Sequence, residues 1–167
     1  GLWEFAHLQS GEPAVRGADG TLRIREEMGL VLVLIPGETF WMGSQRTDPS
    51  GQNYDPLGVV GYESPVHEVT LSPYFLSKYE MTQGQWKHCT GRNPSRWGPS
   101  ELILGHQHDL THPVEQVTWT VCMDVLAGLG LQLPSEAQWE CGCRGGTSTA
   151  WWTGSDRPDS GCALQWW

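Results

Sequence analysis

Five cysteines are the residues of this chain best suited to redox or metal chemistry, because a thiolate is both a nucleophile and a ligand for soft metals. They are Cys89, Cys122, Cys141, Cys143 and Cys162. Cys141 and Cys143 fall inside a predicted helix, where side chains two residues apart point about 200° apart. We therefore expect them to be small buried apolar residues and not joint ligands of one metal. Cys162 could be an exposed reactive thiol.

Three histidines, His106, His108 and His112, gather in one predicted loop. Two histidines two residues apart can chelate a metal on a strand, and His112 could supply a third ligand. No carboxylate or cysteine arrangement completes a standard site, so a solvated histidine-rich loop is favoured. We predict no metal site and no catalytic residue in this chain, and leave open whether the three histidines bind anything.

The remaining ionisable candidates are Glu80, Glu136, Glu140 and His67. Glu136 falls at the first position of a predicted helix, where the helix dipole favours a negative charge. We interpret the three glutamates as hydrogen-bond acceptors that hold the fold, and not as acids or bases. For His67, beside a predicted strand, a structural hydrogen bond is favoured over metal binding or acid–base work.

Residues 113–119 are predicted to form a strand, and two helices position the residues that follow, up to residue 146. The first begins at Thr118 or Thr120 and ends at Gly130, with one apolar stripe along it. The stripe consists of Val121, Cys122, Val125, Leu126 and Leu129. The second helix begins after Ser135, which forms a capping box with Gln138, and Gly145 and Gly146 end it.

Upstream, four strands are predicted: residues 30–35, 38–43, 66–71 and 74–79. The first two flank a Pro36-Gly37 turn and form an opening hairpin. Thr82 caps a short helix through a capping box with Gln85, and Trp86 lies on its inner face. Residues 45–65 and 91–112 are predicted loops. Residues 1–28 are interpreted as a linker and edge strand, and residues 29–167 as one domain.

The composition limits the classes of partner. The chain has 167 residues, enough for one domain with a core, and carries a net charge of −9. That charge argues against nucleic acid or an anionic membrane as a partner, and no apolar run approaches the ~18 residues of a membrane helix. The 21 glycines, 11 prolines and 10 tryptophans indicate a loop-rich fold with an aromatic core.

Three stretches resemble one family, the sulfatase-modifying factors or formylglycine-generating enzymes. They are L-V-L-I-P-G-E-T-F-W-M-G-S at residues 32–44, the P-x-H-x-V…Y-E-M-T pattern at 65–82, and V-T-W with Q-L-P-S-E-A-Q-W-E-C-G-C-R-G-G at 117–146. The matching residues with an expected structural role are Pro36, Gly37, Met42, Gly43, His67, Glu80, Thr82, Trp119, Pro134, Glu136, Trp139, Glu140, Arg144 and Gly145.

The resemblance implies an α+β fold, irregular and loop-rich, of the C-type-lectin-like kind. It also implies oxidation of a cysteine in a substrate peptide to formylglycine, with O₂, copper and a pair of active-site cysteines. We expect that pair to lie outside this chain, and Cys143 matches a position that some members bond to a cysteine in the other half. Leu164 stands where relatives carry a calcium-binding asparagine, and leucine offers no side-chain oxygen. Copper and calcium are therefore expected only for a complete family member.

Three interpretations follow. In the first, the chain is the N-terminal portion of a formylglycine-generating-type domain, inactive as given, whose completed form acts on a peptide or protein substrate. In the second, it is a non-catalytic binding or scaffold module of a bacterial signalling protein. In the third, it is a degenerate or frameshifted product, because the pattern is lost after Asp156. The thiol count and the bacterial style of the motifs suggest the cytoplasm.

Overall fold

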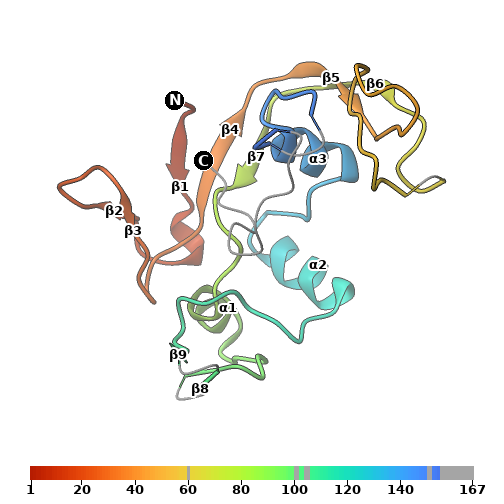
Figure 1. Ribbon diagram of the computed structural model, residues 1–167. Coiled ribbons are helices and arrows are strands. Elements are labelled where there is room, and N and C mark those ends of the chain that lie inside the picture. Colours follow the sequence, from red (N-terminus) through yellow and green to blue (C-terminus); the bar gives the residue numbers. More distant parts are fainter. Residues whose placement is uncertain (60, 100–101, 104–105, 150–151, 155–167) are drawn as a thin grey trace. The chain divides into compact units, whose positions relative to one another are not determined.

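The computed structural model describes residues 1–59, 61–99, 102–103, 106–149 and 152–154 (Figure 1). The chain forms two compact units, residues 1–34 with 77–133 and residues 35–76 with 134–167. Each unit combines short helices with short antiparallel strands, so the class is mixed α and β, as predicted. The sequence-based boundary between residues 28 and 29 stays a prediction.

The first unit contains most of a three-stranded sheet in the order β1-β4-β7. β1 (Glu4–Ala6) pairs antiparallel with β4 (Val31–Ile35), and Glu4 lies opposite Val33. β7 (Tyr74–Ser77) reaches this unit at its last residue, beyond which the Lys78 N–H donates to the Val31 carbonyl at 2.8 Å. Along β4 fully buried residues alternate with half-buried ones. The predicted apolar strand is therefore present, with one face more deeply buried than the other.

The N-terminal residues contain more structure than a linker. β1 is followed by a 3₁₀ turn, η1 (Leu8–Ser10), and by a small hairpin of β2 (Val15–Arg16) and β3 (Leu22–Arg23). Ser10 is fully buried, and its hydroxyl accepts the Leu30 N–H at 2.8 Å. The reason for the difference is that strand pairing and this buried hydrogen bond are long-range contacts that local turn patterns do not reveal.

An ion pair joins β1 to the end of β7 within the first unit. The Glu4 carboxylate accepts hydrogen bonds from Lys78 and Arg16. Burial by itself would raise the pKa of Glu4, but these two cations outweigh burial and hold the pKa below its ordinary value. The Lys78 side chain is only 10% exposed, so this pair is screened less than a surface pair.

Helix α1 (Gln83–Thr90) begins as the sequence predicts. The Thr82 hydroxyl accepts the Gln85 N–H while the Gln85 side chain accepts the Thr82 N–H, which completes the capping box. Gly91 ends the helix in the left-handed region. Trp86 is 4% exposed, and the buried Gln85 side chain also donates to the Met28 carbonyl at 3.0 Å. The inner face of α1 is thus both apolar and hydrogen-bonded.

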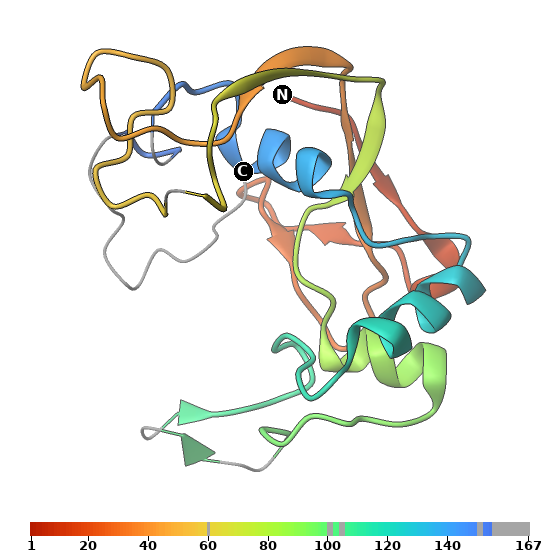
Figure 2. The same cartoon turned by 90° about the vertical axis from the view of Figure 1, so that its right-hand side faces the viewer.

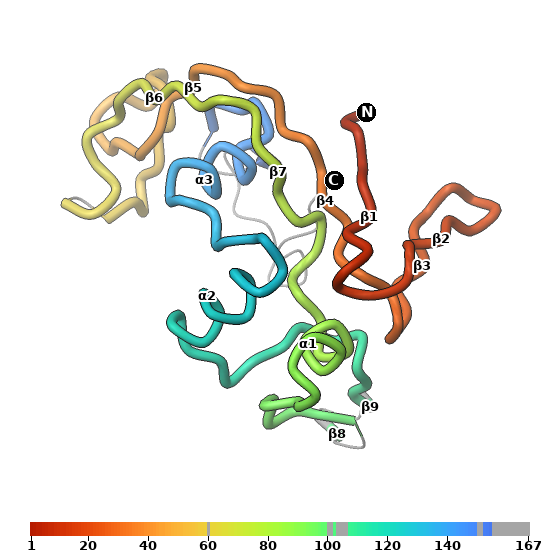
Figure 3. The backbone as a smooth tube through the Cα atoms, turned by 180° about the vertical axis from the view of Figure 1, so that it is seen from behind, coloured from red at the N-terminus to blue at the C-terminus, as the bar shows by residue number. Residues whose placement is uncertain are grey.

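Helix α2 (Trp119–Gly128) is capped by Thr118, but none of its residues is buried. Between α1 and α2 the chain forms a two-residue ladder of β8 (Leu102–Ile103) and β9 (His106–Gln107) inside the predicted loop (Figure 3). In the apolar stripe predicted for α2, Val121 is 44% exposed and the other four residues are half-buried, while Trp119 outside the stripe is 68% exposed. Among the described helices, none has the length and apolar character needed to cross a membrane.

In the second unit, β5 (Glu38–Met42) pairs with β6 (His67–Leu71) and not with β4. Phe40 lies opposite Val69, and the residues after β5 form an irregular loop beyond the end of this ladder (Figure 2). The predicted opening hairpin was therefore wrong. At the Pro36-Gly37 step a side chain on Gly37 would lie 2.8 Å from the Leu71 carbonyl, so this step packs against the end of β6 and does not form a tight hairpin turn.

Helix α3 (Glu136–Arg144) has the predicted capping box between Ser135 and Gln138, and Gly145 ends it in the left-handed region. Its contacts with the residues around β7 are close. The Tyr74 hydroxyl donates to the Gln138 carbonyl at 2.6 Å. A side chain on the buried Gly142 would lie 2.6 Å from Leu76. Glycine at position 142 therefore permits α3 to approach Leu76 closely.

Candidate functional site

The backbone of Gly43, just after β5, is hydrogen-bonded through both its N–H and its carbonyl to side chains of α3. Its N–H donates to Glu140 Oε1 at 2.7 Å, and its carbonyl accepts from Arg144 at 2.9 Å. Arg144 Nε also donates to Glu140 at 2.8 Å, so these two side chains of α3 bind both sides of one peptide segment. We call this arrangement the Gly43 clamp. The clamp brings Gly43 of the M-G-S stretch together with Glu140 and Arg144 of the W-E-C-G-C-R stretch.

Glycine is required at the centre of the clamp for two reasons. Gly43 has φ +91°, which L-residues with a side chain rarely adopt. A Cβ there would also lie 2.5 Å from the Glu63 carbonyl oxygen. The clamp therefore depends on backbone approach as well as on charge.

Asn53 is a third member of the clamp, and the sequence did not single it out. Its amide nitrogen donates to the carbonyls of Trp41 and Gly43 at 2.7 and 2.8 Å, and its own N–H donates to Ser148 at 2.9 Å. The residue is 1% exposed and adopts φ +54°. Asparagine tolerates that region better than most residues. An asparagine inside a Gly- and Pro-rich loop was the only available signal.

The Asn53 Oδ1 atom is buried and has no hydrogen-bond partner within the described part of the chain. Leaving a buried acceptor unpaired costs about 1–3 kcal/mol. Asn53 also lines a pocket of about 190 Å³ beside β5, together with Glu38, Cys141 and Arg144. A pocket with several polar lining residues therefore lies beside the Gly43 clamp.

Cys141 on α3 is 3% exposed, and its thiol donates to Glu38 at 3.2 Å. Burial, followed by this hydrogen bond, raises the pKa of Cys141 to about 11. Burial likewise raises the pKa of Cys143. Both groups are therefore neutral thiols near pH 7, which makes them poor nucleophiles and poor metal ligands.

These properties do not fit the copper that the family resemblance implies. A Cu(I) site needs thiolates directed at one point, whereas Cys141 is protonated and already bonded to Glu38. In the described residues, no group of three or more His, Cys, Asp or Glu side chains is placed to hold a metal ion. Cys162 and Leu164 lie outside the described residues.

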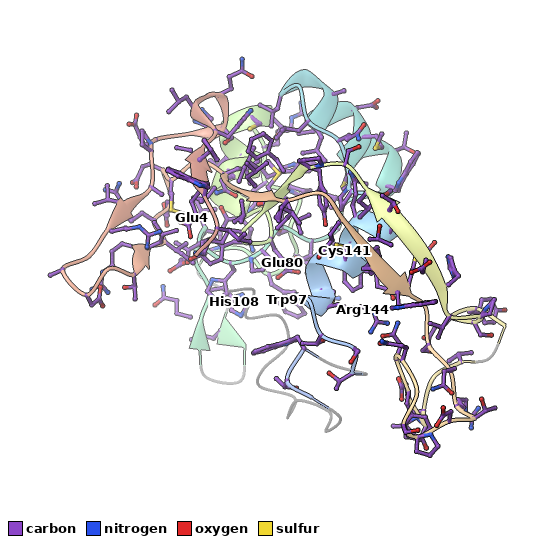
Figure 4. The ribbon with its side chains drawn as sticks, turned by 90° about the horizontal axis from the view of Figure 1, so that it is seen from above. Glu4, Glu80, Trp97, His108, Cys141 and Arg144 are labelled. Carbon is purple, nitrogen blue, oxygen red and sulfur yellow. The ribbon has the colours of Figure 1, made fainter. Side chains whose placement is uncertain are left out.

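The histidine loop belongs to the first unit. The rings of His108 and His112 stack with centroids 4.3 Å apart, and His112 Nδ1 lies 3.2 Å from Asp109 Oδ1. His108 Nδ1 is buried without a partner among the described residues, so this ring is not simply solvated. The His106 side chain lies outside the described part. His108, Glu80 and Trp97 are labelled in Figure 4.

A buried polar cluster in the first unit orders the segment after α1. Gln83 is 1% exposed and donates to the Trp97 carbonyl at 2.9 Å, while Asn93 donates to Gln83 Oε1 at 2.8 Å. The Trp97 N–H in turn donates to Glu115 at 2.8 Å. This cluster is saturated with protein partners, so it positions the chain and does not present a free group for chemistry.

The other candidate residues from the sequence do not take part in the hydrogen bonds of the Gly43 clamp. His67 Nδ1 donates to the Pro65 carbonyl at 2.9 Å. Met42 is half-buried at the end of β5, and Thr82 is buried as the cap of α1. The exposed members of the set are Pro36, Gly37, Glu80, Trp119, Pro134, Glu136, Trp139 and Gly145. The sites that the sequence selected therefore divide between the clamp, helix caps and surface positions.

Comparisons with known proteins show the family of this chain. The family described as "Sulfatase-modifying factor enzyme 1-like domain" matches residues 22–167, and the chain belongs to this family. The formylglycine-generating enzyme of Thermomonospora curvata is 27% identical over 77% of this chain and 53% of its own length. The serine/threonine-protein kinase pkn1 of Chlamydia caviae is 29% identical over 70% of this chain and 20% of its own length.

Among solved structures, PvdO from Pseudomonas aeruginosa superposes with a TM-score of 0.53 at 20% identity, over 83% of this chain and 53% of that chain. This likeness shows a shared fold. The chain thus spans about half the length of the T. curvata enzyme and of PvdO.

Proposed function

We propose that this chain forms the structural N-terminal portion of a formylglycine-generating-type domain and does not catalyse cysteine oxidation by itself. In the complete domain the activity would be oxidation of a substrate-peptide cysteine to formylglycine. The C-type-lectin-like arrangement is part of the same proposal. Family membership supports the class of domain, and the exposed surface of α2 supports its incompleteness.

The incompletely buried apolar surface of α2 is the observation that carries the proposal. The helix reads W-T-V-C-M-D-V-L-A-G, and none of its ten residues is buried. Burying one Val or Leu side chain contributes about 1.5–3 kcal/mol, so a helix of this composition is normally covered. The T. curvata relative is about twice as long as the part that this chain matches. We infer that a further segment of such a domain covers α2.

The thiol chemistry supports the non-catalytic part of the proposal. Cys141 and Cys143 are held as neutral thiols by burial, and Cys89 and Cys122 lie in the other unit. A copper-dependent oxidase of this family would then draw its thiolate pair from residues other than these four. A peptide or protein substrate follows only for the completed domain.

The test is a conversion assay. The purified chain is incubated with Cu(I), O₂ and a cysteine-containing peptide that the T. curvata enzyme converts, and mass spectrometry follows the loss of sulfur from the peptide. The T. curvata enzyme and a copper-only blank are run in parallel. We expect the chain to match the blank. Conversion above the blank that disappears on heat denaturation would show that the chain is catalytic.

A second candidate is a non-catalytic binding or scaffold module of a bacterial signalling protein. The specific observation in its favour is the match to pkn1, in which the related stretch is one fifth of a protein named as a kinase. Reading the parent gene separates the two candidates. A cysteine pair encoded downstream in frame favours the oxidase domain, and its absence favours the module or a degenerate relative.

A further inference from the structure

Trp41 on β5 separates two hollows on the surface of the second unit. Its side chain is 41% exposed. It lines the pocket of about 190 Å³ beside the Gly43 clamp and also a second pocket of about 330 Å³ against the following loop. Gln52 is the other residue that lines both pockets. An exposed indole between two adjoining hollows offers a flat apolar platform with space on either side.

The polar groups around this platform include unused hydrogen-bonding capacity. The Gln52 side chain has no hydrogen-bond partner within the described residues, which leaves two donors and one acceptor free. In the smaller pocket, Glu38 accepts the Cys141 thiol through Oε1 only. Free groups of both donor and acceptor type therefore flank an aromatic face.

The charges of the two pockets disfavour an anionic ligand. Arg144 is engaged by Glu140, Gly43 and Thr149, so its positive charge is already compensated. Glu38 adds a negative charge to the smaller pocket, and Asp48 adds one to the larger. The whole chain carries a net charge of −9, which further opposes an anion.

A strongly cationic ligand also matches the two pockets less well than a neutral ligand does. Asp48 Oδ1 already accepts both the backbone N–H and the hydroxyl of Ser50. Glu38 shares its charge with the Cys141 thiol. The free carboxamide of Gln52, which lies between the pockets, is neutral. The combination of an indole face, a neutral amide and a carboxylate acceptor matches a ligand that carries many hydroxyl groups around an apolar ring face.

We propose that Trp41 and Gln52 form a binding site for a neutral oligosaccharide. One sugar ring stacks its C–H face on the Trp41 indole, and the hydroxyls of neighbouring units hydrogen-bond to the Gln52 amide and to Glu38. The two pockets hold the units on either side of the stacked ring. The site uses only residues of the second unit and does not depend on the proposed function, so either can fail without the other.

The test uses saturation-transfer-difference NMR on the full 167-residue chain with three neutral probes: cellotriose, maltotriose and tri-N-acetylchitotriose. We expect transfer to at least one of them, strongest at the ring protons of a single sugar unit. Trp41→Ala should weaken that binding about tenfold, because stacking on the indole is lost. Trp97→Ala is the matched control, since Trp97 is 40% exposed and lies in the other unit; it should leave the transfer unchanged.

Gln52→Ala provides the second variant, because this side chain is exposed and forms no hydrogen bond within the described residues. It should weaken binding several-fold while the circular dichroism spectrum and urea midpoint stay those of the parent chain. Three results would each overturn the proposal: no transfer to any probe, transfer that survives Trp41→Ala, or Trp41-dependent binding of a trilysine peptide in the absence of sugar binding. The last result would identify the platform as a cation-binding site.

Discussion

The Gly43 N–H donates to the Glu140 carboxylate at 2.7 Å, although the two residues are 97 positions apart in the chain. Arg144 completes the contact by donating to both Glu140 and the Gly43 carbonyl. The M-G-S stretch after β5 and the W-E-C-G-C-R stretch of α3 therefore meet at one peptide unit. Their structural role is to fix α3 against the end of β5, and the first predictions concern this contact.

Removing the carboxylate of Glu140 should destabilise the second unit. In Glu140→Ala, the Gly43 N–H and the Arg144 guanidinium, whose side chain is 14% exposed, lose their common partner. The expected cost is about 2–3 kcal/mol of unfolding free energy, measured by urea denaturation at constant m. Glu136→Ala on the same helix is the control; Glu136 is exposed, so its loss should cost at most about 1 kcal/mol. Equal costs for the two variants would contradict the clamp.

The Gly43 backbone gives a second, steric prediction. Gly43→Ala forces a side chain onto φ +91° and into contact with the Glu63 carbonyl, and should cost about 2–4 kcal/mol. Gly61→Ala is matched, because Gly61 has φ +97° and nothing within 4 Å of its added Cβ. It should cost only about 1–2 kcal/mol. A Gly43 variant no less stable than the Gly61 variant would show that the close approach to Glu63 is not real.

The two capping boxes should differ in strength because of burial. Gln85 is 3% exposed and bonds both Thr82 and Met28, so Gln85→Ala leaves two buried backbone groups unpaired and should cost about 2–4 kcal/mol. Gln138→Ala removes the equivalent side chain from the exposed box of α3 and should cost about 0.5–1 kcal/mol. Thermal unfolding of the pair measures the difference. A Gln138 variant less stable than the Gln85 variant would contradict this difference in burial.

The raised pKa of Cys141 predicts a loss of stability at alkaline pH. In the unfolded chain the thiol loses its proton near its ordinary value of 9, but in the folded chain it keeps the proton until a pKa of about 11. Above pH 9 the unfolded state therefore binds fewer protons, and the free energy of unfolding falls as the pH rises from 9 to 11. Cys141→Ser retains a donor to Glu38 and cannot ionise in this range.

The measurement is urea denaturation of both proteins between pH 7 and 11. Tyr74 also titrates, and its pKa is raised by burial and by its interaction with Cys141, so the difference between the two curves reports Cys141 together with its coupling to Tyr74. The serine variant should show the shallower decline. Parallel curves would mean that the thiol is not buried as described.

Most of the correct predictions about the fold rest on sequence patterns within a few neighbouring residues. The capping boxes at Thr82 and Ser135, and the Gly145 end of α3, depend on residues within one helical turn, and each is confirmed. The four strands predicted between residues 30 and 79 were also placed within a few residues. The strand predicted at residues 113–119 was wrong, because within the described residues only an isolated bridge between Thr82 and Pro113 forms there. The pairing of β5 was wrong because its partner, β6, lies beyond a long loop, and a turn pattern between neighbours cannot exclude such a partner.

The site was less predictable than the fold. Glu140 and Arg144 were identified as structural residues through resemblance, but nothing local indicated that they would meet at Gly43. Asn53 was missed because its role arises from a buried, left-handed loop position that sequence spacing does not encode. The apolar stripe of α2 was recognised, yet a pattern predicts that a face can be buried and not what covers it.

Hydrogen exchange of α2 in the isolated chain tests the central claim most directly. If the chain is the structural portion of a larger domain, the amides of residues 119–128 exchange close to the rate of an unfolded peptide, because no buried residue anchors the helix. Those of α1, anchored by Gln83, Gln85 and Trp86, exchange far more slowly in the same experiment. Protection of α2 equal to that of α1 would contradict the account, since α2 would then already be covered within this chain.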